Sequence, residues 1–172
     1  MNSTITDDDT NTLQIFHINI NCSDFDRALE FYQLIGFRPL LDFDADRDTR
    51  TFGERGIGAV LKLPGNAAGR AMLLALGDNP RATRLDLIEW QQPRSQPHSS
   101  LDRRRDLTRL GLARICLKVK DCEKIYRRLL EHGFESYTPP TRIELGGSYQ
   151  IVFCCEDPDG TVIEFMEFVK SR

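Results

Sequence analysis

The chain has 172 residues, of which 40% are hydrophobic and 28% are charged, and its formal net charge is -3. These values are ordinary for a globular domain and give no general electrostatic attraction to nucleic acid or to an anionic membrane. No apolar run is long enough to span a bilayer. We therefore expect neither a nucleic-acid partner nor a membrane partner.

The N-terminal residues 1–12 are polar and acidic, the opposite of the basic and apolar design of a secretory signal. We interpret them as a flexible tail before a single domain at residues 13–169. The five cysteines are odd in number and include an adjacent pair, which argues against a disulfide framework. No two of them have the C-x-x-C spacing of a zinc ribbon. These features predict reduced thiols and a cytoplasmic protein.

An internal repeat organises the domain. A displacement of 97 residues places residues 16–37 on residues 113–134 without a gap, and a displacement of 78 places residues 85–90 on residues 163–168. The first copy is therefore longer by 97 − 78 = 19 residues. Self-similarity of this kind indicates a duplicated structural unit. The domain then divides into a first copy, a polar linker and a second copy, at residues 13–90, 91–111 and 112–169.

The first copy begins with a strand at residues 14–21, followed by a helix that starts near Ser23-Asp24. Ser23, with Asp26 three residues later, is typical of a capping box. Gly36 stands where a left-handed residue ends a helix. Segments with strand-like composition follow, at residues 39–43, 57–63, 71–76 and 84–90.

The second copy repeats this order with a strand at residues 113–119 and a helix for which Asp121 is the expected N-cap. Gly133 marks the end of that helix, as Gly36 does in the first copy. Further strands are expected at residues 135–138, 150–155 and 161–168, with a turn at Asp157-Pro158-Asp159-Gly160 before the last of them. The second copy is thus a βαβββ unit, and the first has the same order with one further strand candidate in its longer segment. We interpret both copies as βαβββ units, and the fold class is α+β.

Strand alternation places polar residues at equivalent points of the two copies. On the first strand of each copy, His17 and Arg114 point away from the helix-facing side. On the closing strands Asp86 and Glu164 do the same. Polar groups that converge at equivalent points of a duplicated sheet predict a binding cleft rather than a second apolar core.

Several motifs together resemble the glyoxalase / bleomycin-resistance / extradiol-dioxygenase superfamily, which has the vicinal oxygen chelate fold. They are the His17 strand before S-D-F-D-R-A-L-E-F-Y, the G-F after each helix, and D-P-D-G-T-V-I-E-F. The resemblance covers nearly all of residues 13–169. It implies two βαβββ repeats that form an open eight-stranded half-barrel around a metal-binding cleft. Members of the family often dimerise, and open half-barrels leave sheet edges that invite pairing, so we expect a homodimer.

In that family the four equivalent positions hold the metal ligands. His17, Asp86 and Glu164 match this pattern, and the resemblance implies nickel, zinc, manganese or iron as the metal. Arg114, at the fourth position, does not match because a protonated guanidinium has no lone pair to donate. Two alternatives are open: one divalent metal on the three matching residues, or no metal and Arg114 paired with a carboxylate in its place. The second is favoured.

The resemblance implies an isomerase, epimerase or lyase that acts next to a carbonyl or thioester of a small molecule. Glu164 or Asp86 would remove the proton, and His17 with Arg114 or a metal would steady the oxyanion. An extradiol dioxygenase is disfavoured, because its iron site of two histidines and one carboxylate would lack a histidine.

The alternative is a metal-free protein that binds or sequesters a small aromatic or cationic compound, as bleomycin-resistance members do. The residues expected to contact such a ligand are Asn19, Trp90, Met166 and Phe168. The sequence names no substrate, and it assigns no role to the basic run Arg103–Arg105.

Overall fold

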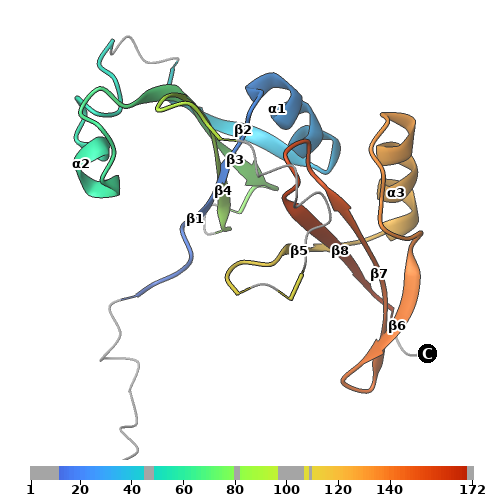
Figure 1. Ribbon diagram of the computed structural model, residues 1–172. Coiled ribbons are helices and arrows are strands. Elements are labelled where there is room, and N and C mark those ends of the chain that lie inside the picture. The colour runs from blue at the N-terminus through green and yellow to red at the C-terminus, as the bar shows by residue number, and fades with distance from the viewer. Residues whose placement is uncertain (1–11, 45–48, 80–81, 97–106, 109, 170–172) are drawn as a thin grey trace, which may run out of the picture.

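The computed structural model describes residues 12–44, 49–79, 82–96, 107–108 and 110–169. It contains two four-stranded sheets with the strand orders β1-β4-β3-β2 and β5-β8-β7-β6, so the second order repeats the first (Figure 1). The elements are β1 (His17–Asn21), α1 (Phe25–Leu34), β2 (Phe37–Asp42), α2 (Ile57–Leu61), β3 (Ala68–Leu76), β4 (Arg84–Gln92), β5 (Ile115–Val119), α3 (Cys122–Glu131), β6 (Thr141–Leu145), β7 (Ser148–Glu156) and β8 (Val162–Phe168). We call β1–β4 with α1 module one, and β5–β8 with α3 module two. The α+β fold of two βαβββ units is confirmed.

The two modules have the same strand register. β1 runs parallel to β4 and pairs Asn19 with Asp86, and β5 runs parallel to β8 and pairs Cys116 with Glu164. The displacements of 97 and 78 residues convert the first pair into the second. The repeat found in the sequence therefore extends to the hydrogen-bonding register of the strands.

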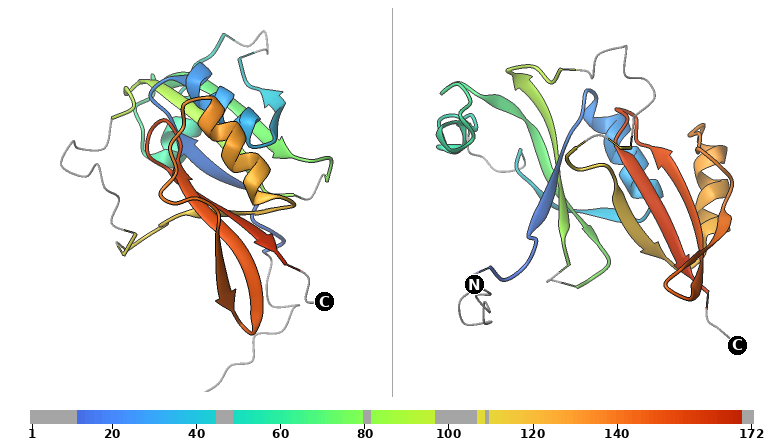
Figure 2. Two further views of the ribbon diagram at one scale, coloured as in Figure 1. Left: turned by 90° about the vertical axis from the view of Figure 1, so that its right-hand side faces the viewer. Right: turned by 60° about the horizontal axis from the view of Figure 1, so that its bottom comes forward.

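The first helical residue of each module is held by a glutamate of the closing strand. The N–H of Phe25 donates to Glu89 at 3.3 Å, and the N–H of Cys122 donates to Glu167 at 2.9 Å. These glutamates are again related by 78 residues. Each helix lies along one face of its own sheet (Figures 1 and 2).

Both long helices begin after an aspartate cap. The carboxylate of Asp121 accepts from the N–H of Lys124 at 2.9 Å, which confirms the predicted cap. In α1 the cap is Asp24, which accepts from the N–H of Arg27 at 3.1 Å. The capping box predicted from Ser23 and Asp26 is therefore wrong. The reason is a long-range contact: the hydroxyl and N–H of Ser23 both donate to Asp159, in the turn before β8.

The strand predicted at residues 57–63 is instead the short helix α2. Gly56 and Lys62 bracket it, with left-handed φ values of 91° and 56°, so the apolar run closes into a turn rather than extending. A Cβ on Gly58 would lie 2.9 Å from the carbonyl oxygen of Pro64, so this turn packs closely against the chain that follows it.

The strand predicted at residues 135–138 is reduced to one isolated bridge between Ser136 and Cys155. The following residues, Pro139 and Pro140, have no N–H to donate to a ladder. The strand that forms is β6, which the sequence reading missed. It joins β7 through Gly146-Gly147, whose φ values of 59° and 73° suit a two-residue hairpin turn.

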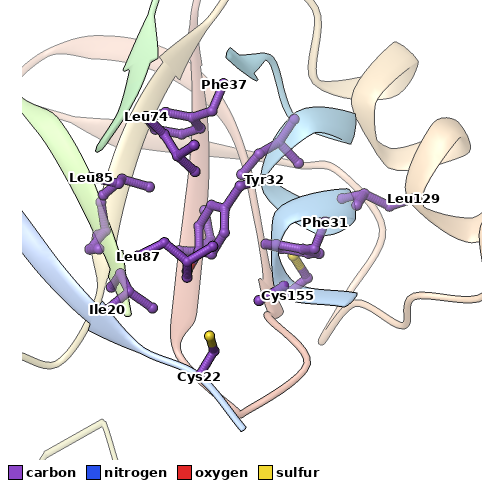
Figure 3. Close-up of a cluster of buried hydrophobic side chains, with 14 of the residues drawn as sticks. Ile20, Cys22, Phe31, Tyr32, Phe37, Leu74, Leu85, Leu87, Leu129 and Cys155 are labelled. Carbon is purple, nitrogen blue, oxygen red and sulfur yellow. The ribbon is translucent and has the colours of Figure 1, made fainter. Parts of the chain in front are cut away.

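One apolar core joins the helix-covered faces of both sheets. In Figure 3, Phe31 and Tyr32 of α1 lie between Leu85 and Leu87 of the first sheet and Cys155 of the second. The Tyr32 hydroxyl donates to the buried Asp157 at 2.8 Å, so a polar contact also crosses between the modules. In the described part of the chain, no helix is long and apolar enough to cross a membrane.

Candidate functional site

The face of each sheet opposite its helix carries the polar side chains that strand alternation predicted, and we call it the site face. On β1 the residues His17, Asn19 and Asn21 are exposed, while Ile18 and Ile20 turn toward the core. On and just before β5, Arg114, Cys116 and Lys118 are exposed, while the residues between them are more buried. The predicted division of faces is therefore present in both modules.

In module one the polar side chains of the edge strand β1 are tied to β4. The Asn19 side chain donates to the backbone oxygen of Asp86 at 3.0 Å, and the Trp90 indole donates to Asn21 at 3.0 Å. The Nε2 atom of His17 lies 3.9 Å from a carboxylate oxygen of Asp86. At that distance the two groups interact electrostatically but make no hydrogen bond.

Asp86 is the less satisfied member of this pair. Its Oδ1 atom is buried and has no hydrogen-bond partner among the described residues. Burial raises the pKa of the Asp86 carboxyl, and the nearby His17 opposes this rise only in part. The carboxylate thus has an acceptor position that a donor or a proton would satisfy.

In module two the equivalent positions carry a direct ion pair. The Nε–H of Arg114 donates to the Glu164 carboxylate. The Glu164 side chain is only 8% exposed, whereas that of Arg114 is 47% exposed. This hydrogen bond and the charge of Glu164 raise the pKa of the Arg114 guanidinium, so the side chain stays protonated.

Two thiols flank Glu164. Cys116 and Cys154 are its register partners on β5 and β7, so the three side chains share the site face. Burial, with the carboxylate of Glu164 as a second cause, raises the pKa of Cys116 to about 11. The thiol form therefore predominates at neutral pH, which makes this position a poor nucleophile.

The metal ligands implied by the resemblance are His17, Asp86 and Glu164. Among the described residues, no group of three or more His, Cys, Asp and Glu side chains lies close enough to hold a metal ion. His17 and Asp86 belong to one sheet, and Glu164 belongs to the other and is already paired with Arg114. In the described part of the chain, these three residues therefore do not come together as a site for a divalent metal.

The residues expected to contact a ligand lie in three different environments. In module one, Trp90 is partly buried and packs edge-on against Phe52, with ring centroids 5.7 Å apart. In module two, Phe168 is 51% exposed and Met166 is partly buried. Asn19 lies in the third, at the middle of β1, which is an edge strand of its sheet.

The sequence reading did not select two residues that shape these environments. The Nζ atom of Lys118 lies 4.9 Å from the ring centroid of Phe168. Alternation from Arg114 would have placed Lys118 on the same face, so the signal was present. Phe52 comes from the longer segment of the first copy, and its contact with Trp90 has no local signal. The Arg103–Arg105 run lies outside the described residues.

A cavity of about 190 Å³ lies where the edge strands β1 and β5 approach each other. Its polar lining comes from Asn19 and Asn21 of module one and from Arg114 and Thr161 of module two. The cavity therefore offers amide, guanidinium and hydroxyl groups to a ligand, and its lining includes no carboxylate. Such a lining suits the oxygen atoms of a small polar or anionic molecule.

Comparison with known proteins agrees with the architecture. The family model described as Glyoxalase/Bleomycin resistance protein/Dioxygenase superfamily matches residues 14–165. No individual curated protein gives a significant sequence match.

Solved structures with the same fold include three glyoxalase relatives. A glyoxalase family protein from Bacillus cereus is 19% identical, with a TM-score of 0.72 over 94% of this chain and 97% of that chain. The trypanothione-dependent glyoxalase I of Leishmania major is 18% identical, with a TM-score of 0.58 over 91% and 87%. A glyoxalase family protein from Enterococcus faecalis is 22% identical, with a TM-score of 0.57 over 90% and 97%. At these identities the likeness establishes the fold.

Proposed function

Since this chain belongs to the Glyoxalase/Bleomycin resistance protein/Dioxygenase superfamily, we propose that it is a metal-independent member that binds a small molecule on its site face. The observation that supports this function is the ion pair between Arg114 and Glu164. A guanidinium in contact with the carboxylate supplies the positive charge that a metal would otherwise supply. A divalent ion beside this fixed cation would meet strong repulsion.

The paired guanidinium keeps donors for a ligand. The hydrogen bond to Glu164 uses Nε, and Arg114 also lines the cavity between β1 and β5. Its terminal amino groups can therefore donate to a carbonyl, carboxylate or phosphate oxygen. Glu164 orients the guanidinium, because a nearly buried carboxylate allows its partner few positions. Asn19 and Asn21 add amide groups on the opposite wall.

Metal analysis of wild type and one variant tests this function. Wild type, purified without chelator and dialysed, should hold no stoichiometric metal by elemental analysis. Arg114→His replaces the cation with an imidazole next to Glu164 and the thiols of Cys116 and Cys154, donors that zinc accepts. Calorimetry should then show zinc binding at about micromolar affinity or tighter, roughly 8 kcal/mol.

A matched control is Lys118→His, four residues after Arg114 on the same face and opposite Met166 rather than a carboxylate. It should gain no comparable zinc affinity. Adding Glu164→Gln to Arg114→His should abolish the gain. Stoichiometric metal in wild type that is lost in Glu164→Gln would overturn the proposal.

A specific observation favours acid–base catalysis as a second candidate function. The unpartnered Oδ1 of Asp86 and the nearby exposed His17 form a carboxylate–imidazole pair on the site face. The burial that raises the pKa of Asp86 makes it a stronger base than an ordinary aspartate. It would take a proton from carbon next to a carbonyl, while Arg114 would hold the developing oxyanion.

Deuterium exchange tests this second function. The probe is the hemithioacetal formed from methylglyoxal and glutathione, incubated with the protein in deuterated water and followed by NMR. Catalysed exchange that is lost in Asp86→Asn, and retained when the exposed Asp78 is replaced by Asn, supports catalysis. If wild type exchanges deuterium only at the uncatalysed rate, the acid–base function is wrong. Ligand binding would then be the remaining proposed function.

We also propose that the protein is a homodimer. The outer strand β2 exposes Leu40 and Leu41, each at least 50% exposed, on a sheet edge. Unpaired edges with apolar side chains favour association. Light scattering at micromolar concentration should give twice the chain mass of 19.7 kDa, and a monomer mass would contradict the proposal.

A further inference from the structure

The site faces of the two modules differ in what covers them. In module one, Phe52 lies over Trp90 and packs with Ala71 and Ile88, and Phe43 contacts the same cluster. Phe52 is only 7% exposed, so the contact is well buried. The protein's own longer segment therefore fills this half of the site face.

That covering segment is a defined structure rather than a loose loop. Thr51 and Glu54 form a reciprocal capping box in which each N–H donates to the other side chain. The N–H of Gly53 donates to the oxygen of Ala67 at 2.8 Å. A Cβ on Gly53 would lie 2.1 Å from the oxygen of Gly65, so only glycine permits this approach. Thr51 and Gly53, the residues on either side of Phe52, are thus both fixed by hydrogen bonds of their backbone N–H groups, which holds Phe52 in position.

Module two carries equivalent positions with different side chains. Asn21 and Trp90 of module one correspond to Lys118 and Phe168 of module two, by the displacements of 97 and 78 residues. The amide–indole hydrogen bond is replaced by an ammonium group 4.9 Å from an aromatic ring centroid. Phe168 is 51% exposed, in contrast to the partly buried Trp90.

The charge on this half is positive. Arg114, just before β5, and Lys118, on β5, lie on the same face, and the negative charge of Glu164 is already paired with Arg114. Beside them, Met166 and Phe168 provide an apolar surface. A cationic ligand would be attracted by the carboxylates of Asp86 and Glu164. Asp86 lies near the imidazole of His17, and Glu164 is paired with the guanidinium of Arg114, so both sites already have a basic group beside the carboxylate.

A buried acceptor lies at the far end of the same surface. Gln150 pairs with Phe168 in the strand register and is only 3% exposed. Its Oε1 atom has no hydrogen-bond partner among the described residues, while its Nε2 donates to Ser148. A ligand that reaches this end would satisfy the acceptor with a hydroxyl or amide group.

We infer that the ligand of this protein is a small organic anion with a flat apolar body, and that this body lies on module two rather than symmetrically between the modules. Its anionic group contacts Arg114, and its apolar body extends along Met166 toward Phe168, where the ammonium of Lys118 adds a second positive charge. Phe52 determines this choice, because it occupies the corresponding place in module one. This inference rests on the proposed small-molecule function and specifies its ligand.

Three probes with one body and different charges test it: 2-naphthoate, 2-naphthamide and 2-naphthylmethylammonium. Titrations of the full chain are followed by ¹H–¹⁵N NMR. Naphthoate should shift amides of Ile115–Val119 and Val162–Phe168 and leave those around Trp90 unchanged. Naphthamide should bind about fivefold more weakly and the ammonium probe more weakly again, as expected for a partly solvent-screened charge contact.

Lys118→Met keeps the length of the side chain and removes its charge. It should weaken naphthoate binding about fivefold and leave naphthamide binding unchanged. Lys124→Met, on the exposed side of α3, is the matched control and should change neither. Phe168→Leu should weaken both probes.

Naphthoate shifts centred on Trp90 would overturn the placement on module two. Equal affinity for the carboxylate and ammonium probes, or no shifts with any probe, would overturn the anionic ligand class. None of these results affects the metal analysis of wild type and Arg114→His, which uses no organic ligand. Failure of this inference is therefore distinguishable from failure of the proposed function.

Discussion

In module one the equivalent pair is His17 and Asp86, 3.9 Å apart, whereas in module two Arg114 is hydrogen-bonded to Glu164. The backbone register beneath both pairs is the same. The duplicated framework has therefore kept its geometry while its side chains have diverged. Module one has an imidazole and a carboxylate with an unused acceptor, and module two has a direct ion pair.

The second contrast lies further along the same strands. Trp90 is packed under Phe52, while Phe168 is exposed beneath Lys118. One aromatic residue is thus packed inside its own module, and its counterpart is open to solvent. Equivalent positions in a repeat need not share a role, because the longer segment of one copy changes what surrounds them.

The largest expected effect is a difference in the free energy of unfolding between variants of these two aromatic residues. Trp90→Ala should destabilise the protein by about 2–4 kcal/mol, because it leaves a cavity under Phe52 and frees the Asn21 acceptor. Phe168→Ala should cost less than about 1 kcal/mol, because half of that side chain is already in water. Urea unfolding of both variants measures the difference. Equal losses would show that Phe52 does not protect module one.

The next effect concerns the ion pair of module two. Glu164→Gln should cost about 1–2 kcal/mol, less than a fully buried pair because the Arg114 guanidinium is half exposed. A double-mutant cycle with Arg114→Met should return a coupling energy of about 1 kcal/mol or more.

The matched control for that cycle is the exposed pair of Arg127 and Glu123, which uses the same atom types at 2.8 Å. Its coupling should stay below about 0.5 kcal/mol. Coupling energies of the same size for both pairs would show that burial of Glu164 does not strengthen its ion pair.

Those features of the fold and of the candidate site that follow from local sequence patterns could be predicted, whereas those that depend on contacts between distant residues could not. The repeat and the alternation of side chains predicted the α+β fold and the face that carries His17, Asp86, Arg114 and Glu164, because both patterns follow from periodicity.

Long-range contacts produced some of the failures, and local backbone conformation produced another. Ser23 does not cap α1 because Asp159, far away in the sequence, takes its hydroxyl and N–H. The apolar run that forms α2 has strand-like composition. Left-handed backbone at both of its ends closes it into a short helix instead. Phe52 covers Trp90 through a contact with no local pattern at all.

The smallest effect is the pH dependence at Asp86. Its pKa is raised in the folded state by burial, so the folded protein binds this proton more tightly than the unfolded chain does. The associated stability is present at low pH and is lost as the pH rises through the raised pKa. Relative to Asp86→Asn, wild type should therefore lose stability as the pH rises above the ordinary aspartate range, about pH 4. Parallel pH profiles for the two proteins would contradict the raised pKa.

The Nε–H resonance of Arg114 in a ¹H–¹⁵N spectrum reports most directly on whether this guanidinium stands where a metal would bind. Held by Glu164, this proton should exchange slowly, give a resolved peak in wild type and lose that peak in Glu164→Gln. Addition of one equivalent of zinc should leave the wild-type peak unchanged, because the carboxylate is already occupied. Loss of the peak on adding zinc, with recovery after chelation, would show that a metal displaces Arg114 from Glu164 and would contradict metal-independent function.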